Sequence, residues 1–301
     1  MRAVFTTKLE PEYDDLPEQR YHFRRPYLRQ AEATIGDWIV YYEPRRPGGL
    51  DSGSTGRQSY FATARVSRIR SDPNRENYFY ADVTDYLEFD RAVPFREGTR
   101  YFESGLRRTD GNTSKGAFGR SVRPIADEEF DLILAAGYAP LVDAAALSKR
   151  PEITLPLGFE DEPATFERPL VERLTVRPFR DAAFSLAVKK AYADTCALTG
   201  LKIINGGGRV EAQAAHIRPV ADAGPDSVRN GLALSGTAHW MFDRGLVTID
   251  DDLTILTAGD RLPEAVTRMF VPEGRIRMPI RPEWRPHPQF LRYHRERVFK
   301  G

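Results

Sequence analysis

The chain has 301 residues, of which 41% are hydrophobic and 29% charged, as is typical of a globular protein. This length predicts two domains, and no apolar run reaches the ~18 residues that a membrane-spanning helix requires. The N-terminus turns acidic before any apolar segment and does not resemble a signal peptide, so we expect a cytoplasmic protein without membrane contacts. The single cysteine, Cys196, excludes an internal disulfide framework and a zinc site built from paired cysteines.

The net charge of +1 is unevenly distributed along the chain. Residues 1–125 carry a net charge of +3, residues 126–170 carry −7 and residues 171–301 carry +5. Of the 44 basic residues, 37 are arginines, whose planar guanidinium group binds phosphate with two hydrogen bonds. This bias is compatible with nucleic-acid binding and also with a GC-rich genome, so charge alone assigns no function.

The first region is predicted to be mainly β-structure. Aromatic and β-branched residues indicate strands at 37–43, 60–69, 78–86 and 87–95, with a Gly/Pro/Ser-rich loop at 44–57. A short helix is expected at Asp127–Ala136, with Asp127 as its N-cap. Residues 137–170 mix proline, glycine and acidic residues and are predicted to be extended. We therefore expect a first domain at 1–125, an acidic connector with a short helix at 126–174 and a second domain at 175–301.

The second region is predicted to contain a ββα unit. An amphipathic helix at Phe179–Asp194 precedes two expected strands, one in the CALTGLKI segment (196–203) and one at Val210–Ile217. A helix follows at Thr237–Arg244, with Thr237 as its cap and Gly245 as its end. Residues 246–256 have the pattern of a β-hairpin, and the tail at 259–301 is rich in proline and arginine.

Four polar residues of this unit suggest metal-assisted phosphodiester cleavage. His216 ends a predicted strand, Asn230 follows in a loop, and His239 and Asp243 lie four residues apart on one face of a helix. Two side chains with that spacing can bind one divalent ion from the same side. Hydrolysis also needs a neutral histidine to accept a proton from water and a cation to stabilise the leaving oxygen.

Residues 195–250 resemble the HNH endonucleases, which have a ββα-metal fold, in the order and spacing of His216, Asn230 and His239. The resemblance implies that His216 is the general base, that Asn230 braces the loop, and that His239 binds a divalent metal ion, Mg²⁺ or Mn²⁺. Asp243 occupies a position where a further ligand often lies. Arg218 and Arg244 flank the motifs and could contact phosphate or simply be solvated.

The chain departs from the family pattern at two places. Many HNH proteins carry a metal ligand immediately before the first histidine, whereas this chain has Ala215, so the second ligand is Asp243 or another residue such as Gln213 or Glu211. Many members also contain a structural zinc on two cysteine pairs. A single cysteine cannot provide them, and we expect no structural zinc and a buried Cys196.

Four segments of the first region resemble the EVE domains of the PUA-like superfamily: VFTTKLEPEY, GDWIVYYEPRR, YFATARVSRIRSDP and GRSVRPI. The resemblance implies a curved β-sheet or barrel that holds a flipped, modified base in an aromatic pocket. Aromatic faces can replace the stacking that such a base loses when it leaves the duplex. Candidates for this pocket, several of which could instead be core residues, are His22, Phe23, Tyr27, Trp38, Tyr41 and Tyr42.

Together these patterns predict an α+β protein with an N-terminal PUA-like (EVE) domain and a C-terminal ββα-metal HNH domain. The predicted function is modification-dependent, type IV-like restriction of double-stranded DNA that carries 5-methyl- or 5-hydroxymethylcytosine. One HNH site cuts one strand, so we expect a homodimer or two separate encounters. The alternatives are a reader of modified nucleic acid with an inactive HNH unit, which Ala215 favours, and an RNA-directed nuclease.

Overall fold

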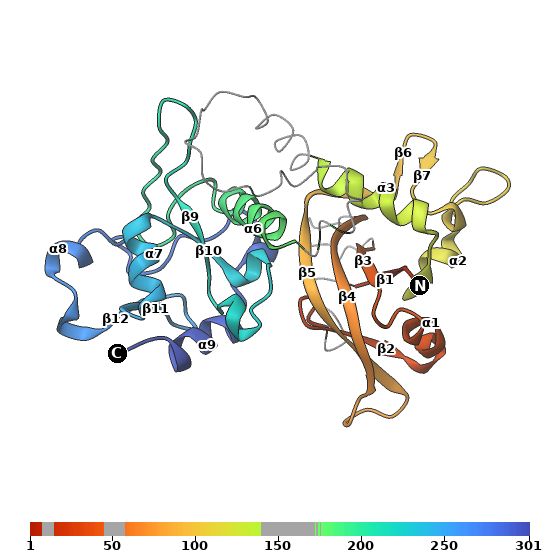
Figure 1. Cartoon of the computed structure of the whole chain (residues 1–301), viewed down its shortest axis with the longest axis horizontal. Coiled ribbons are helices and arrows are strands. Elements are labelled where there is room, and N and C mark those ends of the chain that lie inside the picture. Colours follow the sequence, from red (N-terminus) through yellow and green to blue (C-terminus); the bar gives the residue numbers. More distant parts are fainter. Residues whose placement is uncertain (8–14, 45–57, 140–171, 173, 175) are drawn as a thin grey trace, which may run out of the picture. The chain divides into compact units, whose positions relative to one another are not determined.

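The computed structural model describes residues 1–7, 15–44, 58–139, 172, 174 and 176–301, which divide into two compact units. Unit 1 comprises Met1–Asp85 and Phe89–Arg180, and unit 2 comprises Tyr86–Glu88 and Asp181–Gly301. The predicted α+β class is confirmed, because both units mix helices with strands (Figure 1). Most of the predicted acidic connector and of the predicted loop at 44–57 lies outside the described residues. Across the described ranges, no helix is long and apolar enough to cross a membrane.

Unit 1 is built on a six-stranded sheet with the strand order β2-β5-β4-β3-β1-β8. These strands are β1 (Ala3–Thr6), β2 (Arg20–Arg24), β3 (Trp38–Glu43), β4 (Ser59–Ser71), β5 (Tyr78–Pro94) and β8 (Val122–Pro124). The smaller elements are α1 (Leu28–Glu32), the strand pair β6 (Arg96–Glu97) and β7 (Arg100–Tyr101), α2 (Lys115–Phe118) and α3 (Asp127–Gly137). β1 and β3 are parallel, and β3 and β4 are antiparallel.

The sheet is curled, so that its two edges approach each other. The hydroxyl of Tyr21, on edge strand β2, donates to the backbone oxygens of Thr6 at 2.9 Å and Ser121 at 3.0 Å, on the opposite side of the sheet. Phe5 and Tyr41 pack against the Tyr21 ring inside the curl, with ring centroids 4.8 and 6.4 Å away. The opening between the two edges therefore has an aromatic floor.

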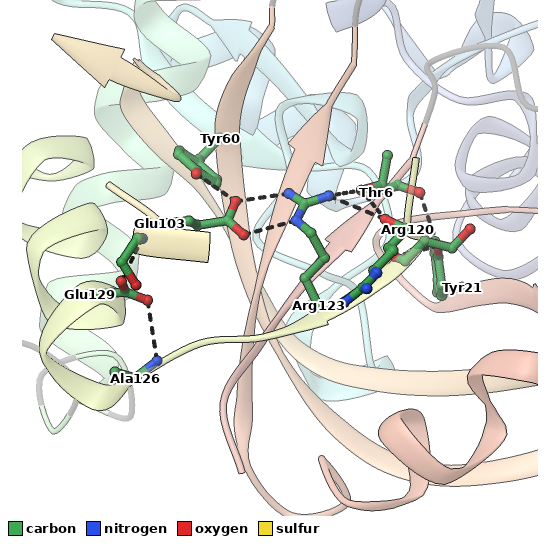
Figure 2. Close-up of polar contacts among 10 residues, drawn as sticks. Thr6, Tyr21, Tyr60, Glu103, Arg120, Arg123, Ala126 and Glu129 are labelled. Carbon is green, nitrogen blue, oxygen red and sulfur yellow. Dashed lines mark hydrogen bonds and ion pairs between the residues drawn. The ribbon is translucent and has the colours of Figure 1, made fainter. Parts of the chain in front are cut away.

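A buried ion pair fixes β8 to the rest of unit 1 (Figure 2). The guanidinium group of Arg123 donates twice to the carboxylate of Glu103, at 2.8 Å each, and once to the hydroxyl of Thr6 at 2.6 Å. Tyr60 donates to the same carboxylate at 2.6 Å, so both oxygens of Glu103 are satisfied. Burying this pair is tolerable because each charge is hydrogen-bonded as well as neutralised.

Several predictions for unit 1 need correction. The two strands expected at 78–86 and 87–95 form the single strand β5, which continues through Asp85 although this residue has a φ of +54°. All six residues of β3 are buried, so both faces of this strand are covered. The N-cap of α3 is Ala126 rather than Asp127, and Glu129 accepts a 3.4 Å hydrogen bond from the Ala126 N–H (Figure 2). Asp127 instead lies in the first turn, where its negative charge interacts favourably with the positive end of the helix dipole.

Unit 2 contains the predicted ββα arrangement, built from partly different segments. Its elements are α6 (Arg177–Ala191, which begins in unit 1), β9 (Gln213–His216), β10 (Gly231–Leu234), α7 (Gly236–Asp243), β11 (Val247–Ile249), β12 (Ile255–Thr257), α8 (Glu264–Thr267) and α9 (Pro288–Arg297). β9 pairs antiparallel with β10, and β11 with β12, as expected for the 246–256 hairpin. One hydrophobic cluster joins α6, both hairpins, α7 and α9, and it includes the fully buried Cys196.

The first strand of the ββα unit is not the predicted one. Residues 196–203 were expected to turn and then extend; the turn is present, since the Gly200 N–H bonds back to the Cys196 carbonyl at 2.9 Å and Gly200 has a positive φ of 72°, but no strand follows it in this segment. The missed strand β10 is short, and all four of its residues are buried. α7 starts at Gly236 with Ser235 as N-cap, two residues before the expected cap Thr237. As predicted, Gly245 terminates the helix: it has a φ of +71°, the left-handed conformation with which helices commonly end.

Candidate nuclease site and candidate base pocket

The β9–β10 hairpin and α7 carry the predicted nuclease residues. β9 ends at His216, which lies opposite Gly231 in the hairpin, and a Cβ on Gly231 would approach Val188 Cγ2 to 2.4 Å, so helix α6 can pack closely only against glycine. α7 turns Ala238, Met241 and Phe242 into the core, which leaves its other face exposed. Its first backbone N–H, that of Gly236, donates to Glu211 Oε1 at 2.7 Å.

A cleft of about 420 Å³ brings three of the predicted residues together. His216, His239 and Asp243 all line it, although they come from the end of β9 and from the exposed face of α7. The side chains of His216 and His239 are 18% and 24% exposed, so both imidazoles can reach a ligand in the cleft. Arg218 and Arg244 do not line this cleft, and Arg218 instead stacks over the ring of Tyr293 at 4.9 Å.

The imidazole of His216 is held from two directions. The ring of Phe184 on α6 stacks against it, with centroids 3.8 Å apart and planes 11° apart. Nε2 lies 2.9 Å from Oδ1 of Asp226, whose side chain is 1% exposed. Across the residues that the structure describes, Nδ1 of His216 has no hydrogen-bond partner. The ring therefore presents Nδ1 as its available nitrogen.

The imidazole of His239 is held by its Nδ1 atom. Gln213 Oε1 lies 2.9 Å from Nδ1, and the carboxylate of Asp243 lies 3.4 Å from Nε2. An amide oxygen on Nδ1 selects the tautomer with the proton on that nitrogen and leaves the lone pair on Nε2, beside Asp243. Gln213 was predicted as an alternative metal ligand, and in the structure it contacts His239, the predicted ligand, instead of lining the cleft.

The donor set fits a divalent cation bound mainly by waters and substrate. His239 Nε2 and an Asp243 oxygen offer one imidazole and one carboxylate on the same side of α7, with the second-layer hydrogen bond that metal-binding histidines usually have. Among the described residues there is no cluster of three or more His, Cys, Asp and Glu side chains that could hold a metal ion. Glu211, the other predicted alternative, is engaged at the start of α7. A cation here would thus depend on two protein ligands.

Asn230 is fully buried and ties the β9–β10 loop together. Its amide nitrogen donates to the carbonyls of Arg218 and Pro225, at 3.0 and 2.9 Å, and its amide oxygen accepts from the Arg218 N–H at 2.9 Å. One side chain thus satisfies three backbone groups at both ends of the loop that follows His216. This loop also carries Asp226, so the geometry around His216 depends on the Asn230 amide.

His294 on α9 also lines the cleft, but unlike His216 and His239 it is buried. The Thr248 hydroxyl lies 2.8 Å from its Nδ1, the Phe242 carbonyl lies 3.1 Å from its Nε2, and the Phe242 ring stacks on it. Burial lowers the pKa of His294 to about 4 from the usual 6.5. His294 is therefore a neutral packing residue at neutral pH.

A separate pocket of about 240 Å³ opens between the edges of the curled sheet in unit 1. Three of the predicted base-pocket residues, His22, Phe23 and Tyr27, line it together with Tyr21 and Phe118. Asp15 supplies a carboxylate to the same pocket, where it accepts hydrogen bonds from the His22 N–H and the Thr7 hydroxyl. Sequence reasoning missed Tyr21, Phe118 and Asp15, because only the curl of the sheet brings them together.

The other three predicted pocket residues do not line this pocket. Trp38, Tyr41 and Tyr42 are all buried on β3, with 6% exposure or less. Tyr41 packs against Tyr21, and Tyr42 packs against Phe118, with ring centroids 6.4 and 5.7 Å apart. These two tyrosines therefore form a layer behind the pocket wall.

Residues 196–250 match the family model described as HNH endonuclease. This segment contains β9, β10 and α7 with His216, Asn230, His239 and Asp243, so the ββα unit is an HNH endonuclease domain and the chain carries a nuclease domain. The match covers the second unit in part and leaves the first unit unassigned.

Three solved structures are similar to longer stretches of the chain. A structure described as the modification-dependent TagI restriction endonuclease is 16% identical, with 98% of this chain and 81% of that chain covered and a TM-score of 0.33. The N-terminal domain of Staphylothermus marinus McrB is 12% identical over 45% of this chain and 94% of that chain, with a TM-score of 0.31. The type IV phosphorothioation-dependent restriction endonuclease ScoMcrA is 14% identical over 79% of this chain and 46% of that chain, with a TM-score of 0.19. All three likenesses are weak, and a comparison with curated proteins gives no match.

Proposed function

We propose that this chain is a modification-dependent DNA endonuclease of the type IV-like restriction class. The observation that carries the proposal is the cleft in the HNH domain, where His216 faces the same space as His239 and Asp243. A proton acceptor and a pair of cation ligands in one cleft are the two parts that phosphodiester hydrolysis needs.

In the proposed reaction, His216 accepts a proton at Nδ1 from a water molecule aligned with the scissile phosphate. The water oxygen forms a bond to phosphorus, the bond from phosphorus to the leaving oxygen breaks, and that oxygen takes a proton from solvent. His239 and Asp243 would hold a divalent cation, Mg²⁺ or Mn²⁺, which supplies stabilisation of the charge that develops on the phosphate oxygens. Asn230 keeps the loop after His216 in place.

The pocket in unit 1 is proposed to receive a flipped, modified cytosine. Pockets for drug-sized ligands have volumes of about 300–1,000 Å³. The volume of this pocket, about 240 Å³, is slightly smaller, which suits a ligand the size of one base. Tyr27, Phe23 and Phe118 offer aromatic faces that replace lost base stacking. The Asp15 carboxylate suits the exocyclic amino group of cytosine, since acidic side chains accept hydrogen bonds from that group.

The substrate in this proposal is double-stranded DNA with 5-methyl- or 5-hydroxymethylcytosine. One HNH site hydrolyses one strand, so a double-strand break requires a homodimer or two encounters with the same DNA. The arginine bias of the chain, 37 of 44 basic residues, supports binding to the phosphate backbone.

The test is digestion of one plasmid prepared in unmodified, methylated, hydroxymethylated and glucosylated forms, with Mg²⁺ or Mn²⁺ added. We expect cleavage of a modified form and little cleavage of the unmodified form. Equal cleavage of all forms would remove the modification dependence and leave a plain nuclease. Binding to modified DNA without cleavage under every metal condition would favour a non-cleaving reader. The sequence feature that supports this alternative is Ala215, which cannot bind a metal ion.

A further inference from the structure

The carboxylate of Asp226 contacts the His216 ring at Nε2, whereas the available nitrogen of the ring is Nδ1. Oδ1 of Asp226 is 2.9 Å from His216 Nε2, within ordinary hydrogen-bond distance. The Asp226 side chain is 1% exposed, and an ionised carboxylate can only accept hydrogen bonds. Nε2 of a neutral His216 must therefore carry the proton and donate it.

Two contacts together remove the rotational freedom of the His216 ring. The Phe184 stack fixes the plane of the imidazole, because the two ring planes differ by 11° at a centroid distance of 3.8 Å. The bond to Asp226 fixes which edge of the ring faces inward, since a flipped ring would place a carbon against the carboxylate. A ring held in both respects is preorganised to use Nδ1.

Asp226 is itself anchored by the backbone on both sides. The main chain of Asp226 forms a parallel β-bridge with Leu87, and the next residue, Ser227, donates to the Glu88 carboxylate at 3.4 Å. Leu87 and Glu88 belong to the same compact unit as the nuclease site, although they are far from it in sequence. On the other side of Asp226, Asn230 holds the carbonyl of Pro225 at 2.9 Å. The carboxylate therefore sits on a braced loop.

From this geometry we infer that Asp226 is a positioning residue of the nuclease site, which holds His216 in the Nε2–H tautomer so that Nδ1 takes the proton from water. The inference rests on the proposed nuclease function. During the reaction the Nε2–H bond stays intact, Nδ1 gains the proton of the attacking water, and the resulting imidazolium lies beside a buried negative charge. Asp226 thus stabilises the protonated histidine without accepting a proton, as the orienting carboxylate of a Ser-His-Asp triad does.

The test uses the full chain with the substitution Asp226→Asn. We expect the single-turnover rate of DNA cleavage to fall by about 10²–10⁴-fold, the range for loss of a general base, while Mn²⁺ affinity and DNA affinity stay unchanged. The matched control is Asp222→Asn, the same change at an exposed aspartate of the same loop, which should cleave at the wild-type rate. The double variant Asp226→Asn with His216→Ala should be no slower than His216→Ala alone, because residues that act as a unit are not additive.

A second measurement does not depend on cleavage activity. Nitrogen–proton correlation spectra of the wild-type protein report which ring nitrogen of each of the five histidines carries the proton, and His216→Ala assigns the signal. We expect His216 as the Nε2–H tautomer, changing to a mixture in Asp226→Asn. A Nδ1–H tautomer in the wild type, or wild-type cleavage by Asp226→Asn, would overturn the inference. Absence of cleavage by the wild type on every substrate would instead refute the nuclease proposal, while the spectrum still decides the role of Asp226.

Discussion

His216 and His239 face one cleft, but their surroundings prepare them for different tasks. A carboxylate on Nε2 leaves Nδ1 of His216 as the available nitrogen, whereas an amide oxygen on Nδ1 leaves Nε2 of His239 beside Asp243. The order and spacing of the motif single out both histidines, and the structure places them in one cleft. Sequence could not predict Asp226, because it is one of 43 acidic residues and only the folded loop brings it to His216.

At this scale, the first prediction is that His216→Ala abolishes cleavage and leaves the fold and DNA binding intact. Only proton abstraction is removed, so we expect the rate to fall by about 10²–10⁴-fold. Single-turnover cleavage measures the rate, while thermal unfolding and a gel shift check fold and binding. His287→Ala is the matched control, since His287 caps α9 and does not line the cleft. Wild-type activity in His216→Ala would remove this residue from the mechanism.

A second prediction concerns metal binding by α7. We expect His239→Ala to lose Mn²⁺ binding in a calorimetric titration, and Asp243→Ala to lose it to an equal or smaller extent, because both ligands lie on one face of the helix. Asp222→Ala changes an exposed aspartate that does not line the cleft and should bind as the wild type does. Unchanged affinity in Asp243→Ala would transfer the second ligand position to Gln213 or Glu211, and unchanged affinity in His239→Ala would contradict the proposed metal site.

At the scale of the elements, the sequence predicted the helix of the ββα unit better than its strands. Short apolar runs fit a strand or a turn equally well, and the CALTGLKI run turns because Thr199-Gly200 closes it. β10 was missed because its four residues are buried on both faces and show no alternation. The burial of β10 comes from long-range packing, and a local sequence pattern does not contain that information. The same reason explains Trp38, whose β3 strand is covered on both faces.

The packing of α7, β11 and α9 around His294 gives a prediction on stability. The folded pKa of about 4 lies below the usual 6.5, so the unfolded chain binds the proton more strongly. The free energy of unfolding should therefore be constant above pH 6.5 with respect to this group, fall between pH 6.5 and 4, and level off below pH 4. The full loss is about 3 kcal/mol.

Urea unfolding at a series of pH values measures this dependence. His294→Gln keeps a donor for the Phe242 carbonyl and an acceptor for the Thr248 hydroxyl but does not titrate, so its free energy of unfolding should fall less between pH 6.5 and 4. His287→Gln is the matched control for the same substitution at a histidine at the start of α9 whose ring is not fully buried. Equal slopes in the wild type and His294→Gln would show that other groups cause the acid sensitivity.

At the scale of the whole molecule, reading and cutting are assigned to different units, so they should respond to different substitutions. The chain divides close to residue 180, but Tyr86–Glu88 belongs to the second unit, because its strand bridges the loop that carries Asp226. A fragment that begins near residue 170 would lack this strand. Separation of the two activities is therefore best tested in the full chain with point substitutions.

The last prediction compares two aromatic residues of unit 1 in the non-cleaving His216→Ala background. Tyr27→Ala removes a side chain that lines the pocket and should weaken binding to modified DNA by roughly 5- to 150-fold, as expected for a lost stacking contact of about 1–3 kcal/mol. Binding to unmodified DNA, which is dominated by phosphate contacts, should stay nearly constant. Trp38→Phe changes a buried ring that does not line the pocket and should alter neither affinity.

Gel-shift titrations at one fixed salt concentration measure the ratio of the two affinities, since salt changes the phosphate contribution for both DNAs alike. In the cleaving background, Tyr27→Ala should still nick unmodified DNA at the wild-type rate, because the cleft in unit 2 is untouched. If Tyr27→Ala keeps the wild-type preference and Trp38→Phe loses it, the reading surface lies on the β3 side of the sheet. If neither substitution changes the ratio, the pocket between the sheet edges does not bind the modified base, and the first unit must select DNA by another surface.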